Sequence, residues 1–412
     1  MKQVHVAKSI KEYSNEILNF QKGFPLNTVY IDGRNIKNLF LYRGQNKNYG
    51  STKYLASLFR QQKDEYSLTS TYMHMCDLSN LDSNFSRLSY MQHFGLPTRL
   101  LDLTKEKFVA LYFACQPDEN GCFDKDDGIV DIYCSNTKQN DYDYFSPNVY
   151  SYYSYNDDIV KLVSTLALMT EKDKTYIYNK IHEFEKFVTD SFSSIAIDEN
   201  DINSSISRYY YLFCQFKRKC IEDHSTHPFE YYMSDAIDAN AFTPTNTPIK
   251  AWNYDLTIDL NAYIDEINRK AVDVFTNVNN AYDKLYGSQE MQSLLTAITI
   301  NKDNKESSLK DPLIDFVALL RPFFVKPNID NSRIEAQEGY FLFEPYKESE
   351  NVTITDINED IKKRFAFEDY SITIPANRKK TIFKDLDSSC HINRATLFPD
   401  SENIAKYISR GY

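Results

Sequence analysis

The chain has 412 residues, of which 42% are hydrophobic, and it carries a formal net charge of -11 at pH 7. This length allows two domains, or one domain interrupted by a large insertion. The acidic balance argues against a general nucleic-acid-binding protein and against a membrane-surface protein, because both need clustered lysine and arginine side chains.

The cellular setting can be inferred from what the sequence lacks. It contains no run of about 18 apolar residues, and its first residues lack the apolar core of a signal peptide. The seven cysteines, an odd number without a Cys-x-x-Cys pair, fit reduced thiols. We therefore expect a cytoplasmic protein without membrane contact. No Gly-x-Gly-x-x-Gly or Gly-x4-Gly-Lys-Ser/Thr pattern occurs, which argues against a Rossmann domain and a P-loop.

The N-terminal segment, residues 1–35, predicts a helix and a polar stretch. Its apolar side chains recur at helical spacing, through Ile10, Tyr13, Ile17 and Phe20. The spacing therefore predicts one amphipathic helix in this segment.

A short strand is predicted over residues 39–42, with Arg43 and Gly44 at its end. A guanidinium at this position could clamp a phosphate or a carboxylate, because it donates hydrogen bonds in a planar fork. Gly44 would let the backbone approach that ligand. The alternative is that Arg43 forms a salt bridge with a structural acid such as Asp102.

Residues 87–115 combine polar and apolar side chains most densely. A short helix is predicted up to Gly95 and Pro97, and a second, buried helix runs through Phe108–Cys115. Between them the sequence places a group of polar side chains, which predicts a prearranged hydrogen-bond network because buried polar groups need partners. The members are His93, Thr98, Arg99, Asp102 and Thr104.

This polar group has two interpretations. In the first, Asp102 or Thr104 caps the helix that begins near Lys105, and Arg99 pairs with Asp102 to stabilise the turn. In the second, the group lies at the rim of a ligand pocket. The sequence leaves both open.

Residues 128–134 alternate in a β-rich pattern and predict a strand, after which the composition changes. We interpret residues 136–310 as a mostly helical insertion with helices over 159–187, 206–221 and 260–286. It could serve as a lid or as a lobe that binds a protein partner, such as an antitoxin or a target. The alternative is that its long polar loops are ordinary surface connections.

Two histidines in this insertion, His224 and His227, lie three residues apart. They lack the intervening glutamate and the third ligand of a zinc hydrolase, so we expect no metal. The only tryptophan, Trp252, is expected to be a packing anchor.

The last hundred residues predict further core elements. Asp311 and Pro312 are expected to begin a buried helix over 313–320. An alternating stretch then predicts a strand on which Glu335, Gln337, Gly339 and Phe341 share one face. Further elements are expected in sequence order: a strand over 370–375, a helical turn over 381–386 and a helix over 404–408.

Four blocks, in this order, carry a resemblance to a known family. They are Tyr42-Arg43-Gly44-Gln45, the stretch Gln-His-Phe-Gly-Leu-Pro-Thr-Arg-Leu-Leu-Asp at 92–102, Arg333 to Phe341, and Ala395 to Asp400. Together they resemble the signature of the FRG domain family. The resemblance implies a first half at residues 36–135, a second half at 311–412, and a bacterial or phage setting.

The layout of the polar positions is similar to that of ADP-ribosyltransferases. In that arrangement an early-strand Arg or His grips NAD, a middle-strand Ser or Thr supports the site, and a late-strand Glu binds the nicotinamide ribose. The similarity implies that Gln337, Glu338 or Glu335 is catalytic. It implies cofactor binding by Arg43, Gly44, Thr104, His93, Arg99 and Asp102. The residue aligned with the catalytic Glu is Gln337, and no Glu-x-Glu or Ser-Thr-Ser pattern occurs in these blocks.

We therefore predict an α+β fold, with a small, mostly antiparallel sheet, flanking helices and a large helical insertion. The leading functional hypothesis is an NAD- or nucleotide-binding, ADP-ribosyltransferase-like effector of a bacterial toxin or phage-defence system. The alternative is a non-catalytic sensor or protein-interaction module in which the polar cluster is structural.

Overall fold

The structure is a computed structural model. It describes residues 5–24, 28–31, 34–37, 39–118, 121–123, 125–134, 152–195, 202–222, 260–300, 309–310, 313–328, 331–345 and 354–410. The chain forms two compact units. The sheet unit contains Met1–Asn140, Asn148–Glu171 and Arg321–Tyr412, and the helical unit contains Asp141–Pro147 and Lys172–Leu320. The predicted histidine pair at 224 and 227, Trp252 and the helix start at 311–312 lie outside the described residues.

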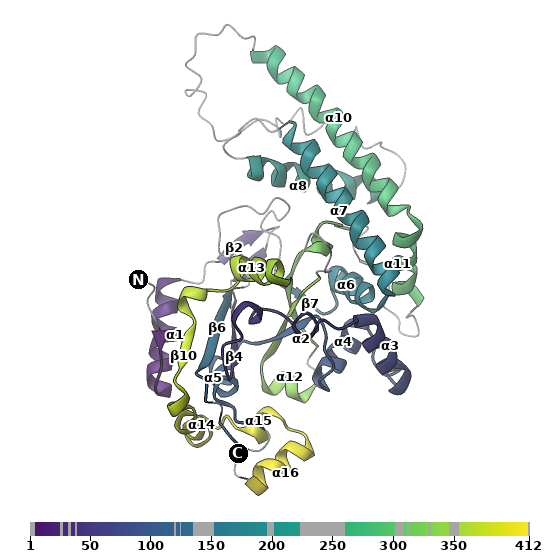
Figure 1. Cartoon of the computed structure of the whole chain (residues 1–412). Helices are drawn as coiled ribbons and strands as arrows, with labels where there is room; N and C mark the ends of the chain where they lie inside the picture. Colours follow the sequence, from purple (N-terminus) through teal and green to yellow (C-terminus); the bar gives the residue numbers. More distant parts are fainter. Residues whose placement is uncertain are drawn as a thin grey trace. The chain divides into compact units, whose positions relative to one another are not determined.

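The core of the sheet unit is an eight-stranded sheet, ordered β1-β10-β6-β4-β5-β9-β8-β7. Figure 1 shows β10, β6 and β4 side by side in this sheet. All its neighbouring strands are antiparallel except the pairs β1 with β10 and β7 with β8 at the two edges. This confirms the predicted α+β class with a mostly antiparallel sheet. The strands are β1 (His5–Val6), β4 (Phe40–Gln45), β5 (Leu100–Thr104), β6 (Gly128–Cys134), β7 (Tyr152–Ser154), β8 (Phe323–Lys326), β9 (Gly339–Phe343) and β10 (Ile372–Ile374). A separate antiparallel pair consists of β2 (Thr28–Ile31) and β3 (Arg34–Lys37).

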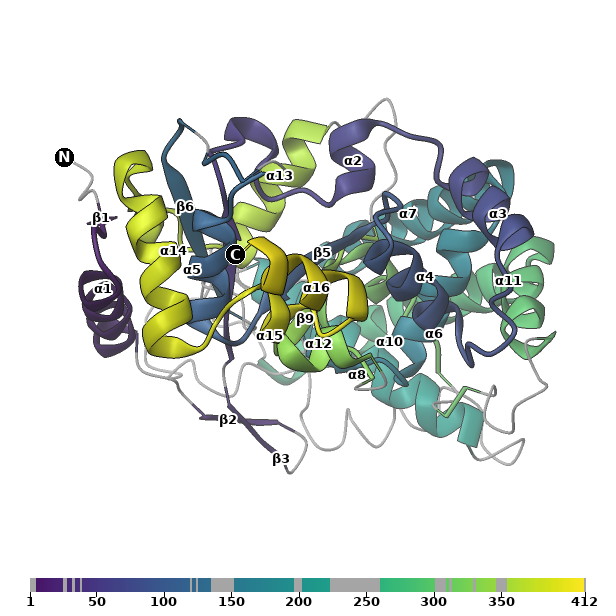
Figure 2. The same cartoon turned by 90° about the horizontal axis from the view of Figure 1, so that it is seen from below.

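One face of the sheet is covered by α1 (Ile10–Gly23), α5 (Lys107–Cys115) and α14 (Ala376–Cys390) (Figure 2). The predicted N-terminal helix is confirmed as α1, where Ser9 caps the first turn and Tyr13, Ile17 and Phe20 are buried. The helical turn predicted over 381–386 is part of the longer α14. We call this the α5 face. Apolar side chains at alternate strand positions pack against these helices, including Tyr42 of β4 and Ile132 of β6.

The opposite face carries the remaining side chains of the same strands. Leu41 of β4, Leu103 of β5 and Tyr133 of β6 pack there with the short helix α2 (Ser57–Gln61) and with α13 (Ile354–Arg364). We call this the α2 face. Other elements of the sheet unit are α3 (Glu65–Met75), α4 (Asn84–His93), α6 (Asp158–Leu168), α12 (Ser332–Ala336), α15 (Arg394–Leu397), α16 (Ser401–Arg410) and the 3-10 turns η1 (Gly50–Thr52) and η4 (Glu368–Tyr370).

The helical unit contains α7 (Glu171–Ser193, from Lys172 onward), α8 (Ile202–Glu222), α10 (Leu260–Tyr286), α11 (Gln289–Ile300) and the 3-10 turn η3 (Ala318–Leu320). Aromatic rings hold the long helices together, as where Phe192 of α7 contacts Phe275 of α10 with centroids 4.9 Å apart. Figure 1 shows α7 and α10 running along one another.

Two helix predictions were wrong in their extent. The helix predicted over 159–187 is two helices, α6 and α7, because Met169 adopts an extended conformation with ψ 162. The helix predicted over 313–320 is reduced to η3. There the Asp315 carboxylate accepts hydrogen bonds from the Ala318 backbone N–H and from the Tyr210 hydroxyl, which favours a turn over a continuous helix.

The strand predicted across 333–342 was also wrong in its first half. The Asn331 side chain accepts a hydrogen bond from the Arg333 N–H and caps α12. Gln337 ends this helix, and Glu338 has a positive φ of 43°, so β9 begins only at Gly339. Glu335 and Gln337 therefore do not share a strand face with Phe341.

Candidate functional site

The sheet opens between its two central strands. β4 pairs with β6 along its whole length, whereas β4 pairs with β5 only at Tyr42 and Thr104. Beyond that pair the two strands separate, and a pocket of about 240 Å³ lies at the opening. Its lining comes from β4, α4, β5, α5, α12, the turn that follows α12, and β9. The pocket therefore combines segments from residues 42–113 with segments from residues 333–341, which are far apart in the sequence.

Six of the nine predicted site residues line this pocket: Arg43, Gly44, His93, Asp102, Thr104 and Gln337. The other three, Arg99, Glu335 and Glu338, are absent from its lining among the described residues. The structure thus brings Arg43, Thr104 and Gln337, which are far apart in the sequence, to one open pocket.

Arg43 lies within β4 instead of at its end, since the strand continues to Gln45. Its guanidinium donates a hydrogen bond to the Lys53 carbonyl oxygen at 3.1 Å. The described residues show no ion pair between Arg43 and Asp102. Arg43 therefore keeps most of its donors for another acceptor.

Gly44 is required by the packing of α5. A Cβ at this position would lie 1.7 Å from the Ala110 carbonyl oxygen, far inside contact distance. The predicted role, in which Gly44 lets the backbone approach a ligand, has a competing explanation here, because the missing side chain lets α5 approach β4.

Arg333 is a second pocket cation, for which the sequence predicted no role. Its guanidinium donates to the His93 carbonyl oxygen at 3.3 Å and lies 4.5 Å from the centroid of the Phe398 ring. Burial lowers the pKa of Arg333. Burial, followed by the charge of Arg333, also lowers the pKa of His93, which favours a neutral imidazole at pH 7. The signal available in the sequence was the presence of Arg333 within a family block.

Asp102 is exposed on β5 and does not cap the following helix, so the prediction of a cap was wrong for Asp102. Glu106 is the N-cap, and its carboxylate accepts from the Phe108 N–H at 3.2 Å. The Asp102 carboxylate instead accepts from the Gln92 amide at 2.7 Å, and Gln92 accepts from the Thr98 hydroxyl at 2.6 Å. This chain of hydrogen bonds holds Asp102 at the pocket and fixes its orientation.

Thr104 joins three segments through its hydroxyl group. It donates to the Gln337 carbonyl oxygen at 2.6 Å and accepts from the Glu106 N–H at 2.9 Å. The side-chain amide of Gln337 in turn donates to the Leu397 carbonyl oxygen at 2.9 Å. Thr104 therefore positions the turn that carries Gln337, and Gln337 keeps its side-chain oxygen as an acceptor.

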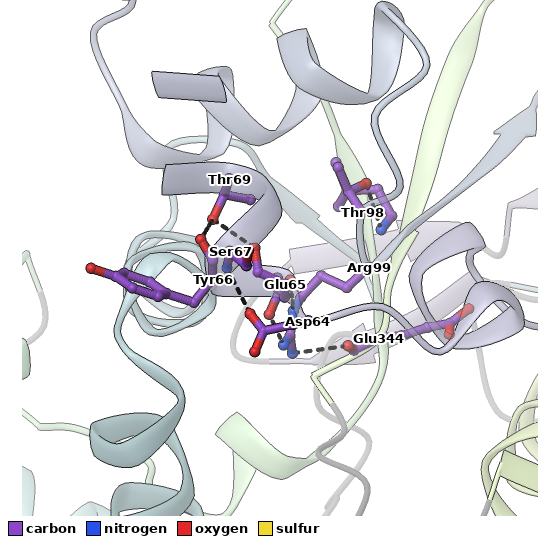
Figure 3. Close-up of polar contacts among 9 residues, drawn as sticks. Asp64, Glu65, Tyr66, Ser67, Thr69, Thr98, Arg99 and Glu344 are labelled. Atoms are coloured by element: carbon purple, nitrogen blue, oxygen red, sulfur yellow. Dashed lines mark hydrogen bonds and ion pairs between the residues drawn. The ribbon is translucent and has the colours of Figure 1, made fainter. Parts of the chain in front are cut away.

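Arg99 is buried away from the pocket lining and pairs with Glu65, so the predicted pairing with Asp102 was wrong (Figure 3). Its Nε donates to the Glu65 carboxylate at 2.7 Å, and its Nη2 forms a second bond to the same group. Its Nη1 donates to the Glu344 carbonyl oxygen at 3.3 Å. This bidentate geometry ties α3 to the sheet and removes Arg99 from the candidate ligand contacts.

Glu335 and Glu338 are exposed beside the pocket. Glu338 contributes its backbone carbonyl, which accepts from the Lys105 N–H at 3.1 Å. Among the described residues that line the pocket, Asp102 is the carboxylate. The late segment therefore brings an amide, Gln337, to the pocket and leaves its two glutamates outside the lining.

The charges of the pocket favour an anion. With His93 neutral, the lining carries the charges of Arg43, Arg333 and Asp102, which sum to a positive value in a chain of net charge -11. Four aromatic residues complete the walls: Tyr42, Phe113, Tyr340 and Phe341. An anionic ligand with a flat ring fits this combination.

Among the described residues, no group of three or more His, Cys, Asp and Glu side chains could hold a metal ion. Within the same residues, no helix is long and apolar enough to cross a membrane.

Comparison with protein-family models matches the FRG domain to residues 38–121. The match includes β4, α4, β5 and α5, and hence the pocket residues Arg43, His93, Asp102 and Thr104. A comparison with curated proteins and a comparison with solved structures found no match. The two strands that separate at the pocket, β4 and β5, thus both lie within the matched segment. The chain contains an FRG domain at residues 38–121.

Proposed function

We propose that the pocket between β4 and β5 binds an anionic nucleotide of the NAD type, and that the protein is an ADP-ribosyltransferase-like effector of a bacterial toxin or phage-defence system. The observation that carries the proposal is the convergence of Arg43, Arg333 and Gln337 on one pocket with aromatic walls. Guanidinium groups match phosphate oxygens, and the rings offer stacking surfaces for a base or a nicotinamide.

The residue that we propose to stabilise charge differs from those that the sequence predicted. Cleavage of a glycosidic bond develops positive charge on the ribose, which a carboxylate stabilises. Asp102 is the pocket carboxylate, and the Gln92 amide holds it in place. Gln337 can accept a hydrogen bond from a ribose hydroxyl. We therefore assign the charge-stabilising role to Asp102 instead of Glu335 or Glu338.

A second candidate function is a non-catalytic sensor or interaction module. It is favoured by the hydrogen bonds of Thr104, Gln337 and Arg333, each of which holds a backbone carbonyl oxygen in place. In this case ligand binding or partner binding would occur without turnover, and the helical unit would be the surface for a protein partner.

Isothermal titration of the protein with NAD tests the binding step. We expect saturable binding that is lost in Arg43→Ala and retained in Arg378→Ala, which removes an exposed arginine of α14 away from the pocket lining. Thermal melts of both variants show whether they are folded. If the intact protein does not bind NAD at millimolar concentration, the NAD proposal is wrong.

Two further measurements separate the two candidates. Release of nicotinamide from NAD, abolished by Asp102→Asn with NAD binding intact, supports a transferase. Binding without nicotinamide release, in the presence of a bacterial lysate as a source of targets, supports the sensor. Growth arrest on expression in bacteria that Asp102→Asn relieves supports the effector role.

A further inference from the structure

Asn331 contacts the pocket residue His93, and the orientation of its side-chain amide is fixed. Its Oδ1 accepts a hydrogen bond from the Arg333 backbone N–H at 2.9 Å, which is the N-cap of α12. A backbone N–H can only donate, so the capping atom must be the amide oxygen. The amide nitrogen is therefore the atom that lies 3.3 Å from Nδ1 of His93.

This contact determines which nitrogen of His93 carries the proton. An amide nitrogen is only a donor, so Nδ1 of His93 must accept and is unprotonated. The proton of the neutral imidazole then resides on Nε2. Among the described residues Nε2 has no hydrogen-bond partner and is not a buried atom, and His93 lines the pocket. The tautomer thus leaves one N–H donor available to a ligand.

The groups that face His93 keep its imidazole neutral. Burial, followed by the charge of Arg333 on α12, lowers its pKa. Asp400, just before α16, and Asp102 on β5 act in the opposite direction with smaller effect. A proton on Nδ1 would also set an N–H against the amide N–H of Asn331. His93 is therefore a neutral donor at pH 7 and above.

We infer that Asn331 is a positioning residue, which holds His93 as a neutral imidazole whose Nε2–H donates to an uncharged oxygen atom of the ligand in the pocket. The inference rests on the proposed function in its choice of NAD, and it adds the protonation state of His93 and a role for Asn331. A neutral donor suits an uncharged oxygen because it forms a hydrogen bond without adding charge. Asp102, whose charge reaches His93, would repel a carboxylate group at this place.

Asn331→Asp tests this role because it keeps the helix cap and reverses the contact with His93. An aspartate caps α12 as an asparagine does. Its other carboxylate oxygen can only accept, so Nδ1 of His93 must carry the proton, and the carboxylate raises the pKa of the imidazole. Above that pKa, Nε2 presents a lone pair to the pocket instead of a donor. The matched control is Ser332→Asp, which adds the same charge at the neighbouring, exposed residue of α12.

The first measurement is nitrogen-15 NMR of the full chain with labelled histidine, without ligand, in which His93→Gln identifies the signals of His93. We expect the proton on Nε2 in the intact protein, with a pKa below the ordinary 6.5. Asn331→Asp should move the proton to Nδ1 and raise the pKa above that value, and Ser332→Asp should leave the tautomer unchanged. A proton on Nδ1 of His93 in the intact protein would overturn the inference, whatever the ligand is.

The second measurement is titration of the same proteins with NAD and with ADP-ribose at pH 7 and pH 9. Asn331→Asp should lose about tenfold in NAD affinity between the two pH values, because Nε2 of His93 gives up its proton and its hydrogen bond. The intact protein and Ser332→Asp should change by less than about twofold. ADP-ribose has ribose hydroxyl groups and no carboxamide. A loss for both ligands assigns the contacted oxygen to the ribose, and a loss for NAD alone assigns it to the carboxamide.

Other outcomes separate this inference from the proposed function. If NAD binds and Asn331→Asp follows Ser332→Asp at both pH values, the pocket stands and the donor role of His93 is wrong. If the intact protein binds neither ligand and NMR shows the expected tautomer, the NAD proposal fails and the positioning of His93 by Asn331 stands.

A second variant keeps the test decisive if thermal melts show that Asn331→Asp does not fold. Asn331→Ser retains a capping side chain but is too short to hold Nδ1 of His93. We expect both neutral tautomers of His93 to coexist in this variant. A single form with the proton on Nε2 would overturn the role of Asn331.

Discussion

Two arginine clusters adjoin each other in the sheet unit, and they differ in how completely their polar atoms are paired. In the Arg99 cluster, made of Arg99, Glu65 and the Glu344 backbone carbonyl, the guanidinium binds a carboxylate in bidentate geometry and a carbonyl oxygen (Figure 3). The Arg43 cluster is made of Arg43, Arg60, Tyr133 and the Glu344 side chain. In it, Arg43 and Arg60 repel each other beside atoms of Tyr133 and Glu344 that lack hydrogen-bond partners among the described residues. Glu344 belongs to both, through its backbone and its side chain.

This difference indicates that Arg99 stabilises the fold, whereas Arg43 remains available to a ligand. Burial of charge is tolerated when a partner of opposite charge and full hydrogen bonding compensate for lost hydration. Arg99 meets that condition within the protein. Arg43 and Arg60 do not, and Arg43 lines the pocket, where the proposed anionic ligand would supply compensation for its charge.

The largest expected effect comes from breaking the paired cluster. Arg99→Met should lower the free energy of unfolding by about 3 to 5 kcal/mol, because it leaves the Glu65 carboxylate buried without its partner. Urea denaturation measures this loss. The double variant Glu65→Leu with Arg99→Met should recover much of it. A loss below about 1 kcal/mol for Arg99→Met would contradict the assigned structural role.

An effect of at most similar size should follow pH through Glu344. Burial raises its native pKa to about 8, above the ordinary value of 4.5, so the folded state retains a proton that the unfolded chain releases. The free energy of unfolding should therefore fall as pH rises from 4.5 to 8, by as much as roughly 4 kcal/mol.

Glu344→Gln should remove this contribution while its side-chain oxygen still accepts from the Ala56 N–H. Denaturation of both proteins across that pH range tests the expectation. Parallel pH profiles for the two proteins would show that Glu344 does not titrate as described.

The smallest expected effect on stability is that of Arg60→Gln. Because Arg43 repels Arg60 and no hydrogen-bond partner for its Nε occurs among the described residues, the substitution should change the free energy of unfolding by less than about 1 kcal/mol, and toward greater stability. Arg378→Gln, at an exposed position, is the control. A loss of several kcal/mol in Arg60→Gln would mean that the two clusters do not differ as proposed.

Local patterns predicted many elements correctly, and they failed where a side chain competes with backbone hydrogen bonding. The helical spacing around Tyr13 and the alternation of residues 128–134 correspond to α1 and β6. The stretch 333–342 alternates too, but the Asn331 cap and the positive φ of Glu338 make its first half a helix and a turn. A short alternating run therefore could not determine which residues reach the pocket.

The sequence by itself determined the FRG signature, the α+β class and the main helices, because motif order and apolar periodicity are properties of neighbouring residues. Only the tertiary structure decided that Arg99 pairs with Glu65, that β4 and β5 separate beyond Tyr42 and Thr104, and that Arg333 joins the pocket. These features depend on strand register and on contacts between distant segments. The partner of a buried charge is chosen by which groups the folded chain brings within hydrogen-bond distance, and local sequence does not specify that.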